Sequence, residues 1–263
     1  MTTGTALVSG ASRGVGRGIA VALGAAGWRV WVTGRSGREA GSSSHLPGTV
    51  EETAEAVTTA GGIGVPRVCD HRDPALVEAL VHEISSTGPL DLLVNCAWAG
   101  YERLNAGAWA EWNAPFWEQP LELFDLMFDG GVRTHYLTSR AAAPALMKAR
   151  GLIVTVSMEA GAADAPGYGV AYSASKAADD RLTESMARQL RDVGVGVVSV
   201  YPGLVRTEGV MQFADHLDLT DSQSPEGVGR TIAALAADDH LRDSGRGVYV
   251  TELAERYGLD ITA

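Results

Sequence analysis

Tyr172 and Lys176 stand four positions apart in the segment GVAYSASKAADDRL, which has a helical pattern. Residues four apart lie on one face of a helix, so the lysine ammonium is placed near the phenol. A nearby cation favours the phenolate and lowers the pKa of a tyrosine toward neutrality, which lets the hydroxyl exchange a proton with a carbonyl or an alcohol. We therefore predict that Tyr172 is a catalytic acid and that Lys176 is its electrostatic partner.

The composition makes this pair specific. The chain has seven tyrosines but only two lysines among its 21 basic residues. A chance Tyr-x-x-x-Lys therefore has odds of about one in twenty. An exposed helical pair is the alternative that stays open, because most lysines are solvated.

A second candidate site is the glycine-rich segment LVSGASRGVGRGIA, in which Gly10, Gly14 and Gly16 follow a predicted strand and open a predicted helix. Glycine allows a tight turn and a close approach to a pyrophosphate, and the helix N-terminus adds N–H donors and partial positive charge. A tight turn without a ligand is the alternative. The position of the turn at the first strand-to-helix junction favours a dinucleotide, with Ser12 and Val15 in the phosphate turn.

The residues after the second predicted strand indicate which dinucleotide is bound. An NAD site usually has a carboxylate there for the ribose hydroxyls, whereas this strand ends VTGRS, with Gly34 at that position and Arg35 beside it. Arg13 approaches from the glycine turn. Two guanidinium groups with Ser36 suit a 2'-phosphate, so we predict NADPH rather than NADH. Two solvated surface arginines are the alternative.

The elements that must position these residues alternate between strand and helix. Seven short β-rich runs are separated by longer helical patterns, and this alternation is typical of βαβ units. We predict one Rossmann-type α/β domain over residues 1–263, a doubly wound parallel sheet with strand order 3-2-1-4-5-6-7 and helices on both faces. Ligands of such sheets bind at the carboxyl ends of the strands.

Three long segments, 34–49, 97–120 and 206–225, follow predicted strands at those carboxyl ends. The first is rich in glycine and serine, and we predict that the other two are substrate loops. Residues 97–120 hold four of the six tryptophans. The predicted walls of an apolar substrate pocket are Trp98, Tyr101, Trp109, Trp112, Phe116 and Trp117, with a core or subunit contact as the alternative.

The composition also excludes several classes of function. A formal net charge of -11 argues against non-specific binding to nucleic acid. The chain has no apolar run of membrane-spanning length and no secretory leader pattern, so we expect a cytoplasmic protein without a membrane partner. The six histidines show no metal-ligand spacing, so we expect no metal site. Cys69 and Cys96 are expected to be reduced thiols, because two other strands separate them in the predicted sheet.

Five segments, SGASRGVG, CDHRD, VNCAWAG, YSASK and YPGLVRT, resemble in order and spacing the short-chain dehydrogenase/reductase superfamily. Within it, FWEQP, RTHY, GLIV and LAERYGLD are similar to the group typified by dehydrogenase/reductase member 1. The resemblance implies a carbonyl reductase or alcohol dehydrogenase that acts on a small molecule. It also implies a homodimer or homotetramer formed through the fourth and fifth helices.

The resemblance further implies roles for residues near the strand ends. Asp70 bonds the adenine, Asn95 borders the cofactor channel, and His71 and Ala97 adjoin these two positions. The residues implied to hold the nicotinamide carboxamide are Pro202, Gly203, Val205 and Thr207. Ordinary turn residues at strand ends are the alternative for each of these positions.

Two positions depart from the family pattern. Gly131 stands where most members have an asparagine that links the lysine to solvent, and Arg133, His135 or water alone are the candidate replacements. The family serine, about thirteen residues before the tyrosine, falls on Met158. Ser157 is one residue earlier, and an inserted residue within 161–170 would shift the register. We predict that Ser157 orients the substrate, with a plain strand-end serine as the alternative.

We therefore predict an NADPH-dependent oxidoreductase that moves a hydride between nicotinamide and a carbonyl or alcohol, with Tyr172 as the proton donor. The main rival is a dinucleotide-binding sensor with little or no catalysis. A sensor would explain the missing asparagine but gives no reason for the Tyr172 and Lys176 pair.

Overall fold

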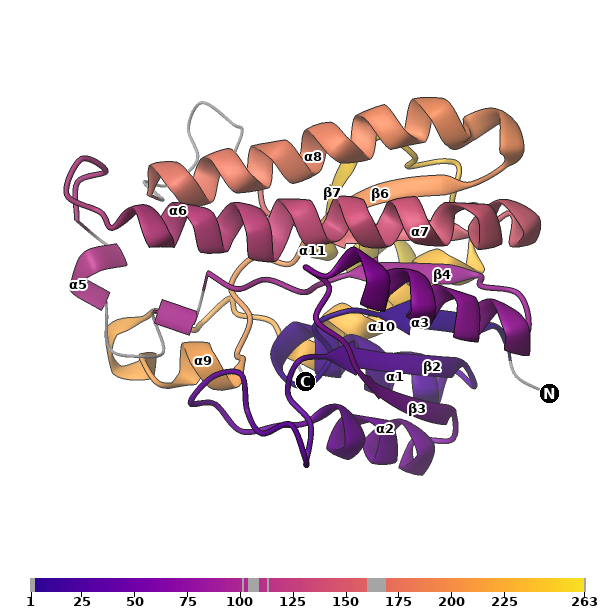
Figure 1. Ribbon diagram of the computed structural model, residues 1–263, viewed down its shortest axis with the longest axis horizontal. Coiled ribbons are helices and arrows are strands. Elements are labelled where there is room, and N and C mark those ends of the chain that lie inside the picture. Colours follow the sequence, from indigo (N-terminus) through magenta and orange to yellow (C-terminus); the bar gives the residue numbers. More distant parts are fainter. Residues whose placement is uncertain (1–2, 101, 104–108, 113, 160–168, 263) are drawn as a thin grey trace.

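A computed structural model of the chain describes residues 3–100, 102–103, 109–112, 114–159 and 169–262. Seven parallel strands form one sheet with the order β3-β2-β1-β4-β5-β6-β7, as predicted. Helices cover both faces of this sheet (Figure 1). The strands are β1 (Thr5–Val8), β2 (Arg29–Gly34), β3 (Ile63–Val68), β4 (Leu92–Asn95), β5 (Leu152–Val156), β6 (Gly196–Tyr201) and β7 (Gly247–Tyr249).

The apolar runs of the central strands reflect burial on both faces of the sheet. In β1, Ala6 and Val8 belong to one hydrophobic core, whereas Leu7 between them belongs to the other. The edge strand β3 is more exposed and contains Pro66, which pairs in register with Val32. Proline has no backbone N–H, so it fits a strand that has a neighbour on one side only.

Two helical layers enclose the cores. One layer consists of α1 (Gly14–Ala25), α2 (Val50–Thr59), α10 (Pro225–Ala237) and α11 (Val250–Tyr257). The opposite layer consists of α3 (Pro74–Thr87), α7 (Arg133–Ala149) and α8 (Val170–Leu190), which run side by side in Figure 1. The second layer carries Tyr172 and Lys176 on α8, so it brings them to the carboxyl edge of the sheet.

Shorter helices lie around that edge. They are α5 (Trp109–Trp112), α6 (Leu121–Met127), the π-helical turn η1 (Phe128–Val132), which leads into α7, α9 (Glu208–Met211) and the 3-10 turn η3 (Ala214–His216). The 3-10 turn η2 (Arg191–Val193) instead joins the end of α8 to the start of β6, at the opposite edge of the sheet. The predicted substrate loop 206–225 contains α9 and η3. The predicted loop 97–120 is described in part, and Tyr101 lies outside the described residues, as do residues 160–168, where an insertion was considered.

Local signals explain where several helices begin. The Thr49 hydroxyl accepts a hydrogen bond from the Glu52 backbone N–H and the Glu52 carboxylate accepts one from the Thr49 N–H, which forms a capping box at α2. Asp73 caps α3 and Pro74 follows it at the first helical position. Among the helices of the described ranges, none has the length and hydropathy needed to cross a membrane.

Candidate active site

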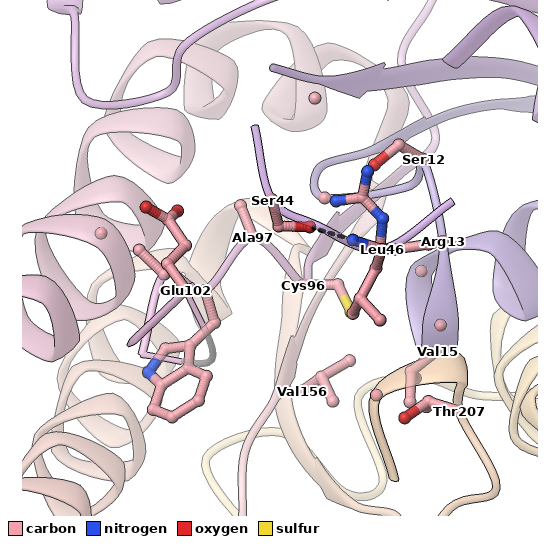
Figure 2. A pocket seen from close by; sticks show the side chains of 18 of the residues that line it. Ser12, Arg13, Val15, Ser44, Leu46, Cys96, Ala97, Glu102, Val156 and Thr207 are labelled. Carbon is pink, nitrogen blue, oxygen red and sulfur yellow. Dashed lines mark hydrogen bonds between the residues drawn. The ribbon is translucent and has the colours of Figure 1, made fainter. Parts of the chain in front are cut away.

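The carboxyl ends of the strands open into a cavity of about 430 Å³ (Figure 2). Its size and position suit a ligand of an open α/β sheet. Every predicted site residue lines it except Ser36 and Asn95. The lining residues are Gly10, Ser12, Arg13, Gly14, Val15, Gly16, Arg35, Asp70, His71, Ala97, Ser157, Tyr172, Lys176, Pro202, Gly203, Val205 and Thr207.

The glycine turn is tight enough to exclude side chains. Gly10 and Gly14 have φ values of +66° and +56°, in the left-handed region that favours glycine. A Cβ on Gly16 would lie 2.3 Å from the Gly10 carbonyl oxygen. The turn therefore brings bare backbone to the start of α1, where N–H groups face the cavity.

An anionic side chain already occupies this helix N-terminus. The backbone N–H of Gly14 donates to Glu208 Oε2 over 2.8 Å. Glu208 starts α9, next to Thr207, and Figure 2 shows Thr207 beside Val15 of the turn. A carboxylate bound at a helix N-terminus demonstrates an anion-binding position, so the turn fits a pyrophosphate. Glu208 is 194 residues away from Gly14 in the sequence, so no local sequence pattern predicts this contact.

Arg13 organises the loop after β2. Its Nη2 donates to Ser36 Oγ at 2.8 Å, to Ser42 Oγ at 3.1 Å and to the Gly48 carbonyl at 3.0 Å. Ser36 is fully buried, so it contacts the predicted site through Arg13. Burial lowers the pKa of Arg13, and the Glu208 carboxylate opposes this shift. The serine-rich segment thus folds onto the predicted phosphate-binding arginine.

A second basic cluster lies at the ends of β2 and β3. Arg35 forms a salt bridge with Glu102, a residue that the sequence did not single out. Arg72 holds Asp70 through both its Nε and Nη2, with Nη2 at 2.6 Å from Oδ2. The hydrogen bond from Arg72 is the main cause of the lowered pKa of Asp70. Burial lowers the pKa of Arg35, and the nearby positive charge of Arg72 adds to this effect.

Two predicted cofactor residues are buried in the protein. Asn95 is fully buried and its Nδ2 donates to Ser139 Oγ over 2.9 Å, whereas its Oδ1 finds no partner among the described residues. His71 bridges Thr33 and Thr138, each hydroxyl lying 2.9 Å from one ring nitrogen. Burial lowers the pKa of His71 to about 4, so its ring is neutral at neutral pH.

The Tyr172 phenol lies among aromatic rings. Its ring meets Trp98 edge-on at 5.3 Å between centroids and Trp112 at 5.9 Å, and both tryptophans line the cavity. Phe116 and Trp117, which the sequence predicted as pocket walls, instead pack on each other and are 61% and 71% exposed. Of the predicted aromatic wall, Trp98 and Trp112 therefore line the cavity, whereas Phe116 and Trp117 do not. The side chain of Trp109 lies outside the described residues.

Lys176 is buried at the end of β5. Its Nζ donates to the Val156 carbonyl over 3.3 Å and lies 5.3 Å from the centroid of the Trp98 ring. Asp179, one turn further along α8, brings Oδ2 to 3.6 Å from this ammonium. Lys176 therefore has a buried carboxylate partner that the sequence prediction missed, although a spacing of three residues on a helix was its signal.

The family serine combines a hydroxyl with a position beside the tyrosine. In this chain Ser157 has the hydroxyl, whereas Met158 has the position beside Tyr172. Ser157 is 3% exposed and its hydroxyl donates to the backbone carbonyl of Lys176 over 3.4 Å. The Tyr172 hydroxyl donates to Met158 Sδ over 3.1 Å. This geometry does not favour the predicted substrate contact of Ser157, because its hydroxyl has a backbone partner and Met158 lies at the phenol.

Gly131 lacks a side chain because an indole fills the adjacent space. A Cβ at Gly131 would lie 2.5 Å from Trp98 Cδ1 and 3.0 Å from Nε1. Gly131 belongs to the buried π-helical turn η1, one turn before His135 on α7. Trp98 thus excludes an asparagine at the position where the family resemblance predicts one.

The segment after β6 closes the cavity. Gly203 has a φ of +69°, and Val205 bridges to Gln223 in the second predicted substrate loop. The Thr207 hydroxyl accepts a hydrogen bond from the Val210 N–H and caps α9. Throughout the described parts of the chain, no group of three or more histidine, cysteine or acidic residues is arranged to hold a metal ion.

Comparison with known proteins identifies what this architecture is similar to. Residues 4–218 match the family described as short chain dehydrogenase. Dehydrogenase/reductase SDR family member 1 of Mus musculus is 38% identical over 96% of this chain and 81% of its own. A Mycobacterium tuberculosis protein named as an uncharacterized NAD-dependent oxidoreductase is 31% identical over 96% of each chain.

Solved structures of other dehydrogenases have the same fold as this chain. A short chain dehydrogenase from Mycobacterium thermoresistibile superposes with a TM-score of 0.82 at 26% identity, over 98% of this chain and 88% of that one. A structure from Beutenbergia cavernae that contains NADP at low occupancy gives a TM-score of 0.75 at 25% identity, over 97% of this chain and 98% of that one. The likeness extends over both halves of the sheet.

Proposed function

This chain belongs to the short-chain dehydrogenase family, and from that premise we propose that it is an NADPH-dependent oxidoreductase acting on a carbonyl or alcohol substrate. One observation carries the proposal: Tyr172 and Lys176 line the same cavity as the glycine turn. A phenol, a buried ammonium and an anion-binding helix N-terminus in one cavity are the parts that hydride transfer with coupled proton transfer requires.

The chemistry of these groups suggests a role for each of them in the proposed reaction. The dinucleotide, when bound, supplies or accepts the hydride. In reduction, the Tyr172 hydroxyl gives its proton to the substrate oxygen, and in oxidation the phenolate takes that proton back. The Lys176 ammonium stabilises the phenolate in either direction.

The remaining predicted residues would hold the dinucleotide. We propose the glycine turn for the pyrophosphate and Asp70 for the adenine, with His71, Asn95 and Ala97 bordering the channel. The proposed carboxamide contacts are Pro202, Gly203, Val205 and Thr207. The bare backbone of the turn supports this placement.

The preference for NADPH rests on this chain's own residues, because a relative is named NAD-dependent and a similar structure contains NADP. Arg13 and Arg35 both line the cavity, and Ser36 hydrogen bonds to Arg13. Gly34 places no carboxylate at the end of β2. Two guanidinium groups and no carboxylate at position 34 favour a ribose that carries a phosphate.

The substrate is proposed to be apolar or aromatic. Trp98, Trp112 and Met158 surround Tyr172. Aromatic rings in such a pocket favour a planar or apolar substrate. A thioether cannot donate a hydrogen bond, so in the Tyr172–Met158 contact the phenol is the group that can donate to the substrate oxygen. Self-association through α7 and α8, as a dimer or tetramer, is part of the same proposal and is measured by analytical ultracentrifugation.

The experiment that tests the proposed function combines turnover with binding. NADPH oxidation is followed against a panel of aromatic and aliphatic ketones and aldehydes, and the Kd of NADPH and of NADH is measured by calorimetry. Reduction of at least one aromatic carbonyl with tighter binding of NADPH supports the proposal. Tight NADPH binding without turnover of any panel member supports the dinucleotide sensor instead.

A further inference from the structure

We propose that His135 and Asp179 form a buried ion pair that positions Lys176 and controls how much positive charge reaches Tyr172. The pair takes over the place of the asparagine that the family resemblance predicts at Gly131. This inference rests on the proposed function and adds two positioning residues to it. Neither residue faces the substrate directly, and both act through Lys176.

The contacts form one continuous chain of polar atoms. Lys176 Nζ lies 3.6 Å from Asp179 Oδ2, and Asp179 Oδ1 lies 2.8 Å from His135 Nδ1. The other ring nitrogen, His135 Nε2, lies 2.9 Å from the Ala97 carbonyl oxygen at the end of β4. The side chains are 8%, 1% and 2% exposed for Lys176, Asp179 and His135, so water does not compete for these contacts.

The contacts of the two His135 ring nitrogens indicate how many protons the ring carries. A backbone carbonyl oxygen only accepts hydrogen bonds, so His135 Nε2 carries a proton. A carboxylate also only accepts, so His135 Nδ1 carries a second proton when Asp179 is ionised. The geometry is therefore that of an imidazolium and a carboxylate. Burial raises the pKa of Asp179, but the positive charges of His135 and Lys176 and the hydrogen bond from His135 outweigh it, and the net shift is downward.

The positive charge of His135 affects how much positive charge Lys176 presents to Tyr172. Asp179 stands between two cations, and the charge of His135 offsets its carboxylate. The Lys176 ammonium therefore keeps its full positive charge toward Tyr172. If His135 lost its charge, Asp179 would neutralise Lys176 instead, and the phenolate of Tyr172 would lose much of its stabilisation.

The other titratable groups around the pair do not take over this role. Burial raises the pKa of the Cys96 thiol to about 12, and burial lowers the pKa of His71 to about 4, so both are neutral near pH 7. Asp180, next to Asp179, accepts a hydrogen bond from the Tyr201 hydroxyl instead of from Lys176. Among the described residues of the cavity, Tyr172 is the ionisable group on which the pair acts.

Histidine NMR on the protein without cofactor tests the ion pair independently of activity. In a two-bond ¹H–¹⁵N spectrum at neutral pH, His135 should show protons on both nitrogens, because each faces an acceptor. The signal is assigned by its loss in His135→Asn. In Asp179→Asn, His135 should become a neutral ring protonated at Nε2. A singly protonated His135 in the wild type, or a doubly protonated one in Asp179→Asn, would overturn the proposal.

The pH profile of alcohol oxidation tests the link to Tyr172. His135→Asn keeps a donor toward Asp179 but removes the charge, so the half-maximal pH of kcat/KM should rise by about one unit. The double variant His135→Asn/Asp179→Asn should return toward the wild-type profile, because no unpaired carboxylate is left. Asp243→Asn breaks a buried ion pair with Arg256 outside the cavity and should leave the profile unchanged.

These outcomes separate the two proposals. A single-variant profile equal to the wild type, or a double variant shifted further than His135→Asn, would overturn the positioning role while leaving the proposed function intact. If no substrate is turned over, the proposed function fails, and the NMR result still decides whether the ion pair exists.

Discussion

The Tyr172 hydroxyl donates a hydrogen bond to Met158 Sδ over 3.1 Å. A soft sulfur therefore lies at the phenol where the family resemblance predicts the hydroxyl of a serine. Sulfur is a weak acceptor and cannot donate. At position 158 the pocket therefore offers the substrate oxygen no donor, where the family pattern has a serine hydroxyl.

Met158→Ser should accelerate carbonyl reduction. A hydroxyl at this position would add a second donor to the oxygen that develops negative charge, and we expect kcat for an unactivated ketone to rise about tenfold. Steady-state kinetics on matched ketones measures the effect. An unchanged or lower kcat would contradict the assignment of this position to the substrate oxygen.

Ser157→Ala is the matched control for that variant and the test of the predicted role of Ser157. Its buried hydroxyl donates to the Lys176 carbonyl, so its loss should lower the free energy of unfolding by about 1 kcal/mol and change kcat less than twofold, by the usual cost of one buried hydrogen bond. A fall in kcat of about 100-fold would restore Ser157 as the substrate-orienting serine.

Gly34→Asp should move the cofactor preference toward NADH. A Cβ at Gly34 would lie no closer than 3.6 Å to its neighbours, so the backbone of β2 accepts a side chain at this position. The carboxylate would repel the 2'-phosphate and accept bonds from the ribose hydroxyls. We expect the ratio of Kd values for NADH and NADPH to fall about tenfold or more in calorimetry.

Arg35→Ala should weaken NADPH binding with little change for NADH. Arg17→Ala is the control, because Arg17 pairs with Glu226 and does not line the cavity. We expect the Kd of NADPH to rise about tenfold in the first variant, the usual size of a charge-assisted contact. Equal losses for both dinucleotides, or unchanged NADPH binding, would contradict the phosphate site.

Gly131→Ala should destabilise the fold through Trp98. The new Cβ would lie 2.5 Å from Trp98 Cδ1, so the indole or the η1 turn must shift. Overpacking of this kind costs about 1–3 kcal/mol in the free energy of unfolding. Denaturant titration measures it, and Trp98→Leu in the same chain should recover part of the loss. Equal effects of Gly131→Ala with and without Trp98 would refute the steric explanation.

His71 should make the fold less stable in mild acid. Burial lowers the pKa of His71 to about 4, below its value in the unfolded chain, so the unfolded chain binds the extra proton. Stability therefore falls as the pH drops through the window between the unfolded pKa and about 4. Between pH 7 and pH 5 the His71 contribution is about 2 kcal/mol. Urea titrations of wild type and His71→Gln at both pH values should differ in pH dependence by this amount, and equal dependence would contradict it.

Much of the fold follows from the sequence because strand burial and turn chemistry are local. Leu7 and Val8 point to opposite cores, and a continuous apolar run is what a central parallel strand needs. The predicted strand order was confirmed, and Gly10 and Gly14 have the positive φ values of a tight turn. The spacing of Tyr172 and Lys176 placed both on one helix facing one cavity.

The contacts that were missed join segments far apart in the chain. Glu102 reaches Arg35 and Glu208 reaches Gly14, and neither pairing has a local signature. Asp179 was within reach of sequence reasoning, because it lies three residues after Lys176 on the same helix. The choice between Ser157 and Met158 depends on one residue of register at the end of β5, where alternation along the strand ceases to fix direction.

The central claim is that Tyr172 exchanges the proton that accompanies hydride transfer. The direct measurement is kcat/KM for carbonyl reduction in Tyr172→Phe, beside Tyr136→Phe, which changes a tyrosine 48% exposed on α7. We predict that Tyr172→Phe loses activity by about 1000-fold with the Kd of NADPH unchanged, and that Tyr136→Phe keeps wild-type turnover. Equal turnover in Tyr172→Phe and the wild type would contradict the account.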